Sequence, residues 1–598
     1  MGWKYYLPEA EQEPEVRKQL IVIANSYTGM KVEDIKVIDP CCGSGHILVY
    51  AFDVLMQIYT ASGWSERDAA KSIIENNLFG LDIDDRAGQL SYFAVMMKAR
   101  KYSRRILNGE VKPNVLSIQE SNWMADEFIA YAAGKDKVLE ADLVTLKNVF
   151  TDAKEYGSII SVPMLHFEEL YERMDIIGRS YVEDMFQAQY QSMTAELLHP
   201  LVKQAQIMAQ KYDVVVTNPP YMGASNMNPK LNEFIKNKYA DYKSDFFSAF
   251  VVRASEMTTA NGYCGFFTPY VWMFIQSYEK LRQYLYNQAT IETLIQFEYS
   301  AFEEATVPVC TFAFSNSHVT GKKGNYLRLV DFRGGMEVQR QKTLEAIADH
   351  NCGYYYEQTT DNFSKIPGSP VAYWVSEAVF NAFQEKKLSD FGETSKGIIT
   401  GDNARFLRLW FEVGNYEIAF DVHSYIECQK TESRWYPCNK GGEMRKWYGN
   451  NNYIIDWWHN GYEVMQRGRE RVRNCQDYKD ENKFIPSVTW TSISSGMSSF
   501  RYSDCAISES AGMTLFTKRI QVEYCLAFLN TQVAEDLLKV VNPTLNYTAG
   551  AIASLPIVRT TGDIEEDIIS VAKDNISLSR TDWDSYETSW DFKRHPMV

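Results

Sequence analysis

The sequence predicts an α/β protein in which a doubly wound parallel sheet is followed by a mixed α+β region. Three observations support this prediction. Apolar runs at 35–38, 78–83 and 212–217 have the length and composition of buried parallel strands. Apolar residues between these runs recur at helical spacing, as in 47–58. From about residue 390 the alternation gives way to short, irregular strands rich in Gly, Asn, Ser, Trp and Arg.

A chain of 598 residues is too long for one hydrophobic core, so we expect at least two domains. We place a catalytic domain at 1–330, a connector at 331–389 and a second domain at 390–598. Long helical stretches interrupt the strand–helix rhythm of the first domain. They predict a helical insertion at about 124–210, between two strands of the sheet.

The composition is typical of a soluble globular protein, with 45% hydrophobic and 23% charged residues. No apolar run reaches membrane-spanning length, and the amino terminus has no apolar signal core. The ten cysteines include no C-x-x-C pair, so we expect no metal site and a reducing cytoplasm. The net charge of −16 argues against a nucleic-acid binder, although a local basic groove can coexist with an acidic exterior.

The first strand ends in an acid and leads into a glycine-rich turn. Asp39 and Pro40 precede the turn at 41–45, Cys-Cys-Gly-Ser-Gly, and a helix follows. Gly43 and Gly45 allow backbone N–H groups to face a ligand with no Cβ in the way. The dinucleotide spacing G-x-G-x-x-G and the P-loop lysine are both absent. The acid would repel a pyrophosphate but favour a cationic ligand, such as the amino group of S-adenosylmethionine.

The second strand, at 78–83, also ends in an acid. Asp82 is placed to accept hydrogen bonds from both ribose hydroxyls of a nucleotide. Asp84 and Asp85 are expected to cap the helix that follows. A third strand is expected at 115–118.

The apolar run at 212–217 ends at Asn218-Pro219-Pro220-Tyr221. The exocyclic amine of a base is a poor nucleophile because its lone pair is delocalised into the ring. The Asn218 side-chain carbonyl and the Pro219 backbone carbonyl could each accept one N–H of such an amine and free the lone pair. The prolines fix φ and hold the carbonyl direction, and Tyr221 would stack on the base for about 1–3 kcal/mol. The alternative is a proline-stiffened loop without a chemical role.

In this order, D-P-x-C-G-S-G, G-x-D-I-D and N-P-P-Y resemble the γ-class amino-methyltransferases that make N6-methyladenine in DNA. The resemblance implies a Rossmann-like S-adenosylmethionine-dependent methyltransferase fold and transfer of a methyl group to a flipped adenine. It implies that the catalytic residues are Asn218, Pro219, Pro220 and Tyr221. It also implies that the cofactor is bound by Asp39, Pro40, Cys42, Gly43, Ser44, Gly45, Asp82, Ile83 and Glu120. Residues 245–250 look like the family's next helix.

The resemblance extends along nearly the whole chain. Segments 73–87, 396–406 and 542–547 are similar to the PglX family of bacteriophage-exclusion (BREX) systems. This similarity implies that host DNA is marked as self in the cytoplasm. Only 38 residues precede Asp39, whereas the family has a further cofactor-binding segment there. We therefore expect that the chain lacks the family's amino-terminal part.

The resemblance makes double-stranded DNA the expected partner, together with other proteins of the defence system. The second domain should then read sequence and hold phosphates. The candidate contacts are Arg434, Lys440, Arg445, Lys446, Arg467, Arg469 and Arg501, with Arg471 and Arg473 continuing the run. Alternate arginines spread around a helix, so this run could equally be a solvated face. Residues 492–501 are a candidate loop for close approach to the DNA backbone.

Other interpretations remain open at this point. N-P-P-Y also occurs in enzymes that methylate a glutamine of a release factor and in some RNA-base methyltransferases, which are generally compact. The chain could instead be a cofactor-binding, DNA-recognising subunit of a defence complex that is inactive alone. A restriction–modification fusion would need a nuclease-like cluster of acids and lysine, and we find no convincing one.

Overall fold

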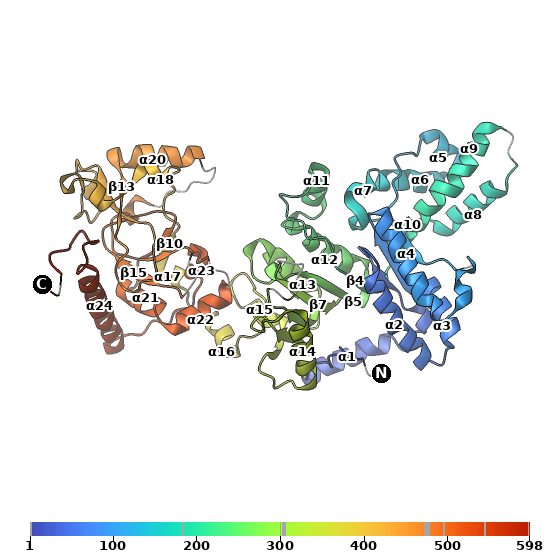
Figure 1. Ribbon diagram of the computed structural model, residues 1–598, viewed down its shortest axis with the longest axis horizontal. Coiled ribbons are helices and arrows are strands. Elements are labelled where there is room, and N and C mark those ends of the chain that lie inside the picture. The colour runs from blue at the N-terminus through green and yellow to red at the C-terminus, as the bar shows by residue number, and fades with distance from the viewer. Residues whose placement is uncertain are drawn as a thin grey trace. The chain divides into compact units, whose positions relative to one another are not determined.

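The computed structural model describes residues 3–109, 111–181, 184–299, 301, 307–471, 479–493, 497–542, 546–595 and 597. The chain forms two compact units, Met1–Ser364 and Lys365–Val598 (Figure 1). Among the residues so described, no helix has both the length and the apolar character needed to cross a membrane.

The first unit is built on a nine-stranded sheet with the order β3-β2-β1-β4-β5-β7-β6-β8-β9. Neighbours from β3 to β5 are parallel, whereas β7 is antiparallel to β5 and β6. The strands are β1 (Val37–Asp39), β2 (Leu78–Asp82), β3 (Asn114–Ser117), β4 (Tyr212–Thr217), β5 (Thr258–Pro269), β6 (Thr290–Gln296), β7 (Val309–Ser315), β8 (Lys323–Arg328) and β9 (Tyr355–Thr359). The order reverses between β1 and β4, and open α/β sheets bind ligands beyond the strand ends at such a point.

Helices cover this sheet because their apolar residues recur on one face. In α2, Leu48, Phe52, Leu55 and Tyr59 are all buried at spacings of four, three and four. The helices outside the insertion are α1 (Pro14–Ser26), α2 (His46–Ala61), α3 (Glu66–Ser72), α4 (Asp85–Arg100), α11 (Pro229–Lys238), α12 (Phe246–Met257), α13 (Glu279–Gln288), α14 (Gly335–Ala348) and α15 (Thr360–Phe363).

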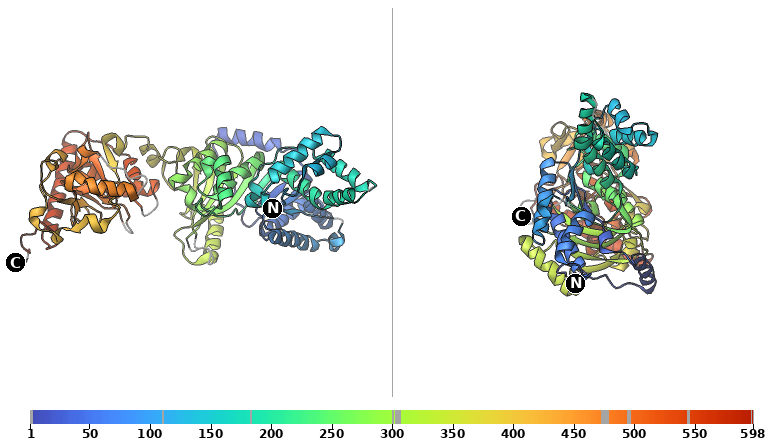
Figure 2. Two further views of the ribbon diagram at one scale, coloured as in Figure 1. Left: turned by 90° about the horizontal axis from the view of Figure 1, so that it is seen from above. Right: turned by 90° about the vertical axis from the view of Figure 1, so that its right-hand side faces the viewer.

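The described residues between β3 and β4 form six α-helices, where the sequence predicts a helical insertion. They are α5 (Asp126–Ala133), α6 (Lys137–Phe150), α7 (Ala153–Tyr156), α8 (Phe167–Arg179), α9 (Met185–Met193) and α10 (His199–Ala209). Figures 1 and 2 show them gathered beside the parallel strands, in cyan to teal. Their last residues return the chain to β4 at the centre of the sheet.

The first unit extends past residue 330, where the strand–helix alternation fades in the sequence. There β8 pairs with β6, and β9 pairs with β8 in antiparallel fashion. The amino-terminal residues also reach this edge, since Gln12 Nε2 donates to the Lys323 carbonyl at 2.8 Å and Asn325 Nδ2 donates to the Pro8 carbonyl at 2.8 Å. These contacts place residues 8–12 beside β8.

The second unit is mixed α+β and contains two four-stranded sheets, β10-β17-β14-β15 and β11-β13-β12-β16. Its strands are β10 (Gly392–Ser395), β11 (Leu407–Leu409), β12 (Trp435–Asn439), β13 (Tyr453–Asp456), β14 (Ser487–Thr491), β15 (Phe500–Ser503), β16 (Ile507–Ser508) and β17 (Gly512–Thr517). Its helices are α16 (Glu377–Ala382), α17 (Leu388–Phe391), α18 (Asn403–Phe406), α19 (Tyr425–Cys428), α20 (Trp458–Arg471), α21 (Val522–Leu529), α22 (Gln532–Val541), α23 (Ala549–Ala553) and α24 (Asp563–Trp583).

Candidate active site

A cavity of about 610 Å³ lies beyond the carboxyl ends of β1, β2 and β4. Three segments singled out in the sequence line it: Pro40 and Cys41 after β1, Asp82 and Ile83 after β2, and residues 218–221 after β4. They meet because the carboxyl ends of parallel strands share one edge of the sheet. The other lining residues are Lys154, Glu155, Tyr156, Gly157, Ser158, Met222, Asn226, Asn228, Leu231, Phe246 and Phe250.

Asp39 ends β1 with a fully buried carboxyl group. Its Oδ1 accepts the Cys41 N–H at 3.1 Å. Within the described chain, neither Asp39 Oδ2 nor the Thr217 hydroxyl has a hydrogen bond of regular geometry. Burial raises the pKa of Asp39 to about 7, and the nearby Asp82 adds to the shift, while Thr217 and the Cys41 amide oppose it. The carboxyl therefore titrates near neutral pH, and a cation beside it would favour the ionised form.

The glycine-rich turn after Asp39 is tied to the next strand. The Gly43 N–H donates to Asp82 Oδ2 at 2.8 Å. Gly45 has φ 84°, and a Cβ there would lie 2.6 Å from Ser91 Oγ. Only glycine therefore fits this position without displacing α4.

Of the predicted cofactor residues, Pro40, Asp82 and Ile83 line the cavity, whereas Asp39, Cys42, Gly43, Ser44 and Gly45 do not. Cys42 is buried beneath the turn, and its N–H donates to the Leu81 carbonyl at 2.9 Å. The Ser44 hydroxyl lies 3.0 Å from His46 Nδ1. Both residues shape the turn rather than the cavity wall.

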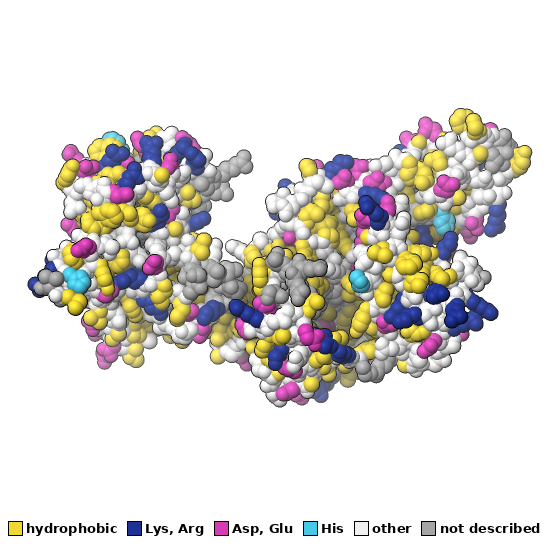
Figure 3. All heavy atoms as spheres, viewed as in Figure 1, with side chains coloured by type: hydrophobic (Ala, Val, Ile, Leu, Met, Phe, Trp, Pro, Cys, Tyr) yellow, Lys and Arg dark blue, Asp and Glu magenta, His cyan; other side chains and the backbone are white. Residues whose placement is uncertain are grey.

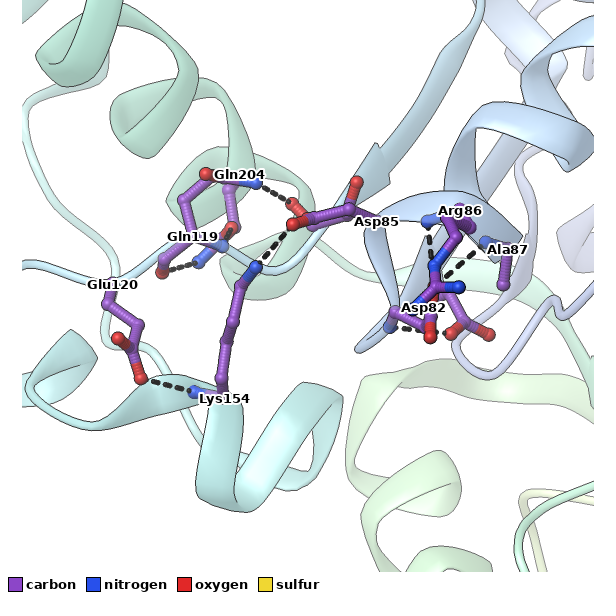
Figure 4. Close-up of polar contacts among 10 residues, drawn as sticks. Asp82, Asp85, Arg86, Ala87, Gln119, Glu120, Lys154 and Gln204 are labelled. Carbon is purple, nitrogen blue, oxygen red and sulfur yellow. Dashed lines mark hydrogen bonds and ion pairs between the residues drawn. The ribbon is translucent and has the colours of Figure 1, made fainter.

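Asp82 lies at the end of β2 with both carboxylate oxygens accepting backbone N–H groups. Besides the bond from Gly43, its Oδ1 accepts the Asp84 N–H at 2.9 Å. Asp84 caps α4 as predicted, because its Oδ1 accepts the N–H groups of Arg86 and Ala87 at 2.7 and 3.2 Å. The prediction that Asp85 caps the helix is wrong. Asp85 is the first helical residue and instead pairs with Lys154 Nζ at 2.6 Å, which lowers the pKa of Asp85 (Figure 4).

The structure does not bring Glu120 into the cavity. Its Oε1 accepts the backbone N–H of Lys154 at 3.1 Å (Figure 4), and its side chain lines a neighbouring cavity of about 690 Å³ with Gln119 and Trp123. Lys154 thus contacts Glu120 through its backbone and Asp85 through its side chain. Glu120 therefore contacts the cavity-lining residue Lys154 without lining the 610 Å³ cavity itself.

The N-P-P-Y residues form the far wall of the cavity. The Tyr221 hydroxyl donates to Asn218 Oδ1 at 2.7 Å and also lies 3.0 Å from the Phe267 carbonyl. Tyr221 remains 38% exposed, and burial of the rest of its side chain raises its pKa, so the hydroxyl stays protonated at neutral pH. The amide of Asn218 is thereby oriented by its own motif.

Asp245 fixes the chain directly after Tyr221. Its Oδ1 accepts the Met222 N–H at 2.9 Å and the Phe247 N–H at 3.3 Å, and the Phe246 N–H donates to the Met222 carbonyl at 3.0 Å. Asp245 is the amino-terminal cap of α12, which confirms the helix predicted after 245. The loop that carries the motif is therefore anchored to a buried helix.

Residues 154–158 complete the cavity, and sequence reasoning missed them. They lie within the insertion, at the end of α7 and directly after it, and carry no recognisable motif. Ser158 Oγ donates to the Pro40 carbonyl at 2.5 Å, Asn228 Nδ2 donates to Glu155 Oε2 at 2.8 Å, and the Tyr156 ring stacks on Phe234 at 4.7 Å. These contacts join positions far apart in the chain, so no local pattern could have shown them.

The candidate DNA contacts of the second unit differ in availability. Arg501 is only 1% exposed, and its guanidinium donates to the Arg445 carbonyl at 3.4 Å and to Thr491 Oγ1 at 3.3 Å. Burial lowers the pKa of Arg501 to about 10. A buried guanidinium held in this way supports the fold, and the proposed contact of Arg501 with DNA is wrong for this reason.

The other candidates lie nearer the surface, several with partners within the unit. Arg434 pairs with Asp456 at 2.7 Å, Arg445 pairs with Asp582, and Lys446 Nζ donates to the Asn530 carbonyl at 3.0 Å. The Lys440 ammonium lies 4.5 Å from the centre of the Tyr453 ring, Arg467 pairs with Glu470 at 3.2 Å, and Arg469 is exposed on α20. Arg473 and residues 494–496 of the 492–501 loop lie outside the described residues.

Comparison with known proteins finds similarity to a restriction-modification methylase family and to two adenine-specific methyltransferases. The family model "Eco57I restriction-modification methylase" matches residues 76–302. "Adenine-specific methyltransferase PglX" of Lacticaseibacillus casei (strain Zhang) is 35% identical over 610 residues, and "Adenine-specific methyltransferase BrxX" of Escherichia coli O9:H4 (strain HS) is 36% identical over 626. Each match covers 100% of this chain and 49% of the relative, so the chain spans about half the length of these relatives.

A solved structure with a similar fold is the Type IIL restriction-modification enzyme MmeI in complex with DNA. It has a TM-score of 0.50 and 10% identity, and covers 97% of this chain and 72% of that chain. Together with the sheet order, these matches confirm the predicted S-adenosylmethionine-dependent methyltransferase fold in the first unit and the mixed α+β second unit.

Proposed function

The chain is similar along its whole length to the PglX and BrxX adenine-specific methyltransferases, and from this premise we propose that it methylates N6 of adenine in DNA. The methyl donor is S-adenosylmethionine, and the mark labels host DNA in a phage-defence system of the BREX type. One observation carries the proposal. A single cavity brings together the turn after Asp39, the acid Asp82 and the motif 218–221.

The residues on one side of the cavity fit S-adenosylmethionine, which when bound supplies the methyl group. Asp39 adjoins the lining residue Pro40, and its Oδ2, buried and without a regular hydrogen bond, suits the ammonium of the cofactor. Asp82 can accept ribose hydroxyls on lone pairs that the Gly43 and Asp84 amides leave unused. Ile83, which is 43% exposed, offers an apolar surface to a purine ring. Asp39, Asp82 and Ile83 are thus the proposed cofactor-binding side chains.

The residues on the other side fit a flipped adenine. Asn218 Oδ1 and the Pro219 carbonyl each accept one N–H of the exocyclic amine, which localises the lone pair on nitrogen. Tyr221 stacks on the base, and its hydroxyl has the Phe267 carbonyl as a second acceptor when the amine engages Asn218. No strong base is needed before the attack, because the amine loses its proton after it has gained the methyl group.

Duplex DNA is the proposed partner, and the second unit is proposed to recognise the target. In this assignment residues 1–330 are the catalytic domain, 331–389 the connector and 390–598 the recognition domain. Because the substrate is host DNA, the protein is expected to act in the cytoplasm, alongside other proteins of the defence system.

Transfer of labelled methyl groups from S-adenosylmethionine to duplex DNA tests the proposal. We expect transfer by the protein and its loss in Asn218→Ala, with cofactor binding unchanged in that variant. DNA binding without transfer, with the other defence proteins present, would favour a recognition subunit that is inactive alone. Transfer only to RNA or to a protein glutamine would refute the DNA assignment.

A further inference from the structure

The first turn of α20 in the second unit has an unusual backbone. His459, Asn460 and Gly461 are three consecutive residues with positive φ, of 51°, 57° and 75°. A left-handed conformation costs a residue other than glycine roughly 1–2 kcal/mol, and such strain gathers at functional sites. Gly461 has a steric reason, since a Cβ there would lie 2.6 Å from the Trp457 ring. His459 and Asn460 are exposed and have no such packing reason.

The helix beyond this turn has one buried face and one exposed polar face. Gly461, Val464, Met465 and Gly468 are buried against the unit. Tyr462, Gln466 and Arg469 follow one another at spacings of four and three, so they share a face, and all three are exposed. Tyr462 is 67% exposed. A tyrosine, an amide and a guanidinium thus stand in one row that begins at the strained turn.

Segment 396–406, one of those that resemble the PglX family, holds α20 in place. A Cβ at Gly401 would lie 2.9 Å from the Arg467 carbonyl, so the loop packs closely on the helix. Arg405 pairs with Glu463 at 2.5 Å. Tyr462, Gln466 and Arg469 therefore lie on a helix whose position is fixed by contacts with segment 396–406. A rigid helix of this kind suits a recognition element.

The row lines an open pocket of about 600 Å³ with His459 and Asn460. Lys483 is buried at the pocket, its ammonium 5.2 Å from the centres of the Trp457 and Tyr425 rings. The two acids of the pocket are matched by cations, since Asp480 pairs with Lys483 at 2.6 Å and Glu470 pairs with Arg467 at 3.2 Å. Figure 3 shows Lys and Arg side chains over α20, interspersed with Asp and Glu side chains. The lining therefore carries no net negative charge that would repel a phosphate backbone.

We propose that the turn and exposed face of α20 read base edges in the major groove of the target DNA, with Asn460, Gln466 and Arg469 as specificity-determining residues. The proposal rests on the DNA substrate of the proposed function. Asn and Gln match the N6 and N7 edge of adenine, and Arg matches the O6 and N7 edge of guanine. Asn460 lies at the amino-terminal end of α20, the end of a recognition helix that commonly reaches base edges, whereas Gln466 and Arg469 lie further along the same helix. The left-handed turn sets Asn460 beside the other two around one pocket.

Selection of bound sequences from a random duplex library, with the full chain as bait, tests this reading without methyl transfer. We expect the chain to enrich a motif, and Asn460→Ala, Gln466→Ala and Arg469→Ala each to relax at least one position of it. A lost base contact should reduce discrimination at that position roughly 5- to 150-fold. The matched control is Asn575→Ala on α24, where the amide is exposed and donates within its own helix to Val571.

Asn460→Gly separates base reading from a purely structural role. Glycine tolerates φ 57°, so this variant should fold with unchanged or higher thermal stability and still relax the motif. Identical motifs for all the variants and the parent chain, or no enrichment by the parent chain, would overturn the proposal. Enrichment of a motif that is never methylated in cells with the intact defence operon would refute the methyltransferase function and leave this reading intact.

Discussion

Binding of S-adenosylmethionine should strengthen as the pH rises through neutrality, because of Asp39. The free site holds a carboxyl group with a pKa of about 7, raised by burial. A cationic ammonium beside it favours the ionised form and lowers that pKa in the complex. Binding therefore requires or drives loss of a proton, and the apparent affinity follows the ionised fraction.

The magnitude follows from the pKa of the free site. With a pKa of about 7, the ionised fraction is about 0.09 at pH 6 and about 0.9 at pH 8, so the dissociation constant should fall roughly tenfold, or about 1.4 kcal/mol. Calorimetric titration in two buffers of different ionisation enthalpy should show release of about half a proton at pH 7. An exposed aspartate, with an ordinary pKa of about 4, would not change its ionisation between pH 6 and 8 and would give no such dependence.

The control is Asp39→Asn, which keeps the shape of the side chain and removes the titration. This variant should bind the cofactor weakly and without pH dependence between about pH 6 and 8. The variant should also be more stable than the parent without ligand at alkaline pH. The folded carboxyl keeps its proton to about pH 7 and the unfolded one to about pH 4, so parent stability falls across that interval. A parent affinity that is flat from pH 6 to 8 would refute this account of Asp39.

Three further predictions concern a turn, the motif tyrosine and a buried cation. Gly45→Ala should lower stability by about 1–3 kcal/mol and abolish cofactor binding, because its Cβ would collide with Ser91, whereas Gly43→Ala meets open space and should cost less in a denaturant titration. Tyr221→Phe should retain most of kcat/KM because the ring still stacks, whereas Tyr221→Ala should lose roughly 5- to 150-fold, and equal losses would contradict a stacking role. Arg501→Ala should lower the melting temperature by several degrees and leave the salt dependence of DNA binding unchanged; a reduced salt slope would instead indicate a phosphate contact.

The parts of the fold that the sequence predicts are those set by local patterns. The strands that lead to Asp39, Asp82 and Asn218 are recognisable in the sequence as short apolar runs. Each run ends in a polar residue at the edge of the sheet. The turn at 41–45 is recognisable in the sequence because two glycines follow an acid at the end of an apolar run. These three segments meet in space because parallel strands share an edge, so half of the site could be assembled from topology alone.

The parts that the sequence could not predict depend on distant partners. From the sequence, Asp85 is expected to cap the helix, whereas in the structure it pairs with Lys154 of the insertion. Glu120 follows the third strand as a cofactor ligand would, but the Lys154 backbone takes up its carboxylate. Arg501 looks like a phosphate contact because arginine is usually exposed, and only the pairing of β14 with β15 shows that it is buried. The pairing of β9 with β8 could not be predicted either, because the strand–helix alternation fades in the sequence at about residue 330.

The place of the insertion has a consequence for synthesis on the ribosome. β1 lies between β2 and β4 in the sheet, yet residues 118–211 are made after β3 and before β4. At roughly 5–20 residues per second, residues 118–211 alone add on the order of 5–20 s to the time that one edge of β1 remains without its neighbour. An unpaired edge at the centre of a sheet is a template for intermolecular pairing. We therefore expect a nascent chain stalled before residue 212 to need chaperones, and the catalytic cavity to form only once β4 has emerged.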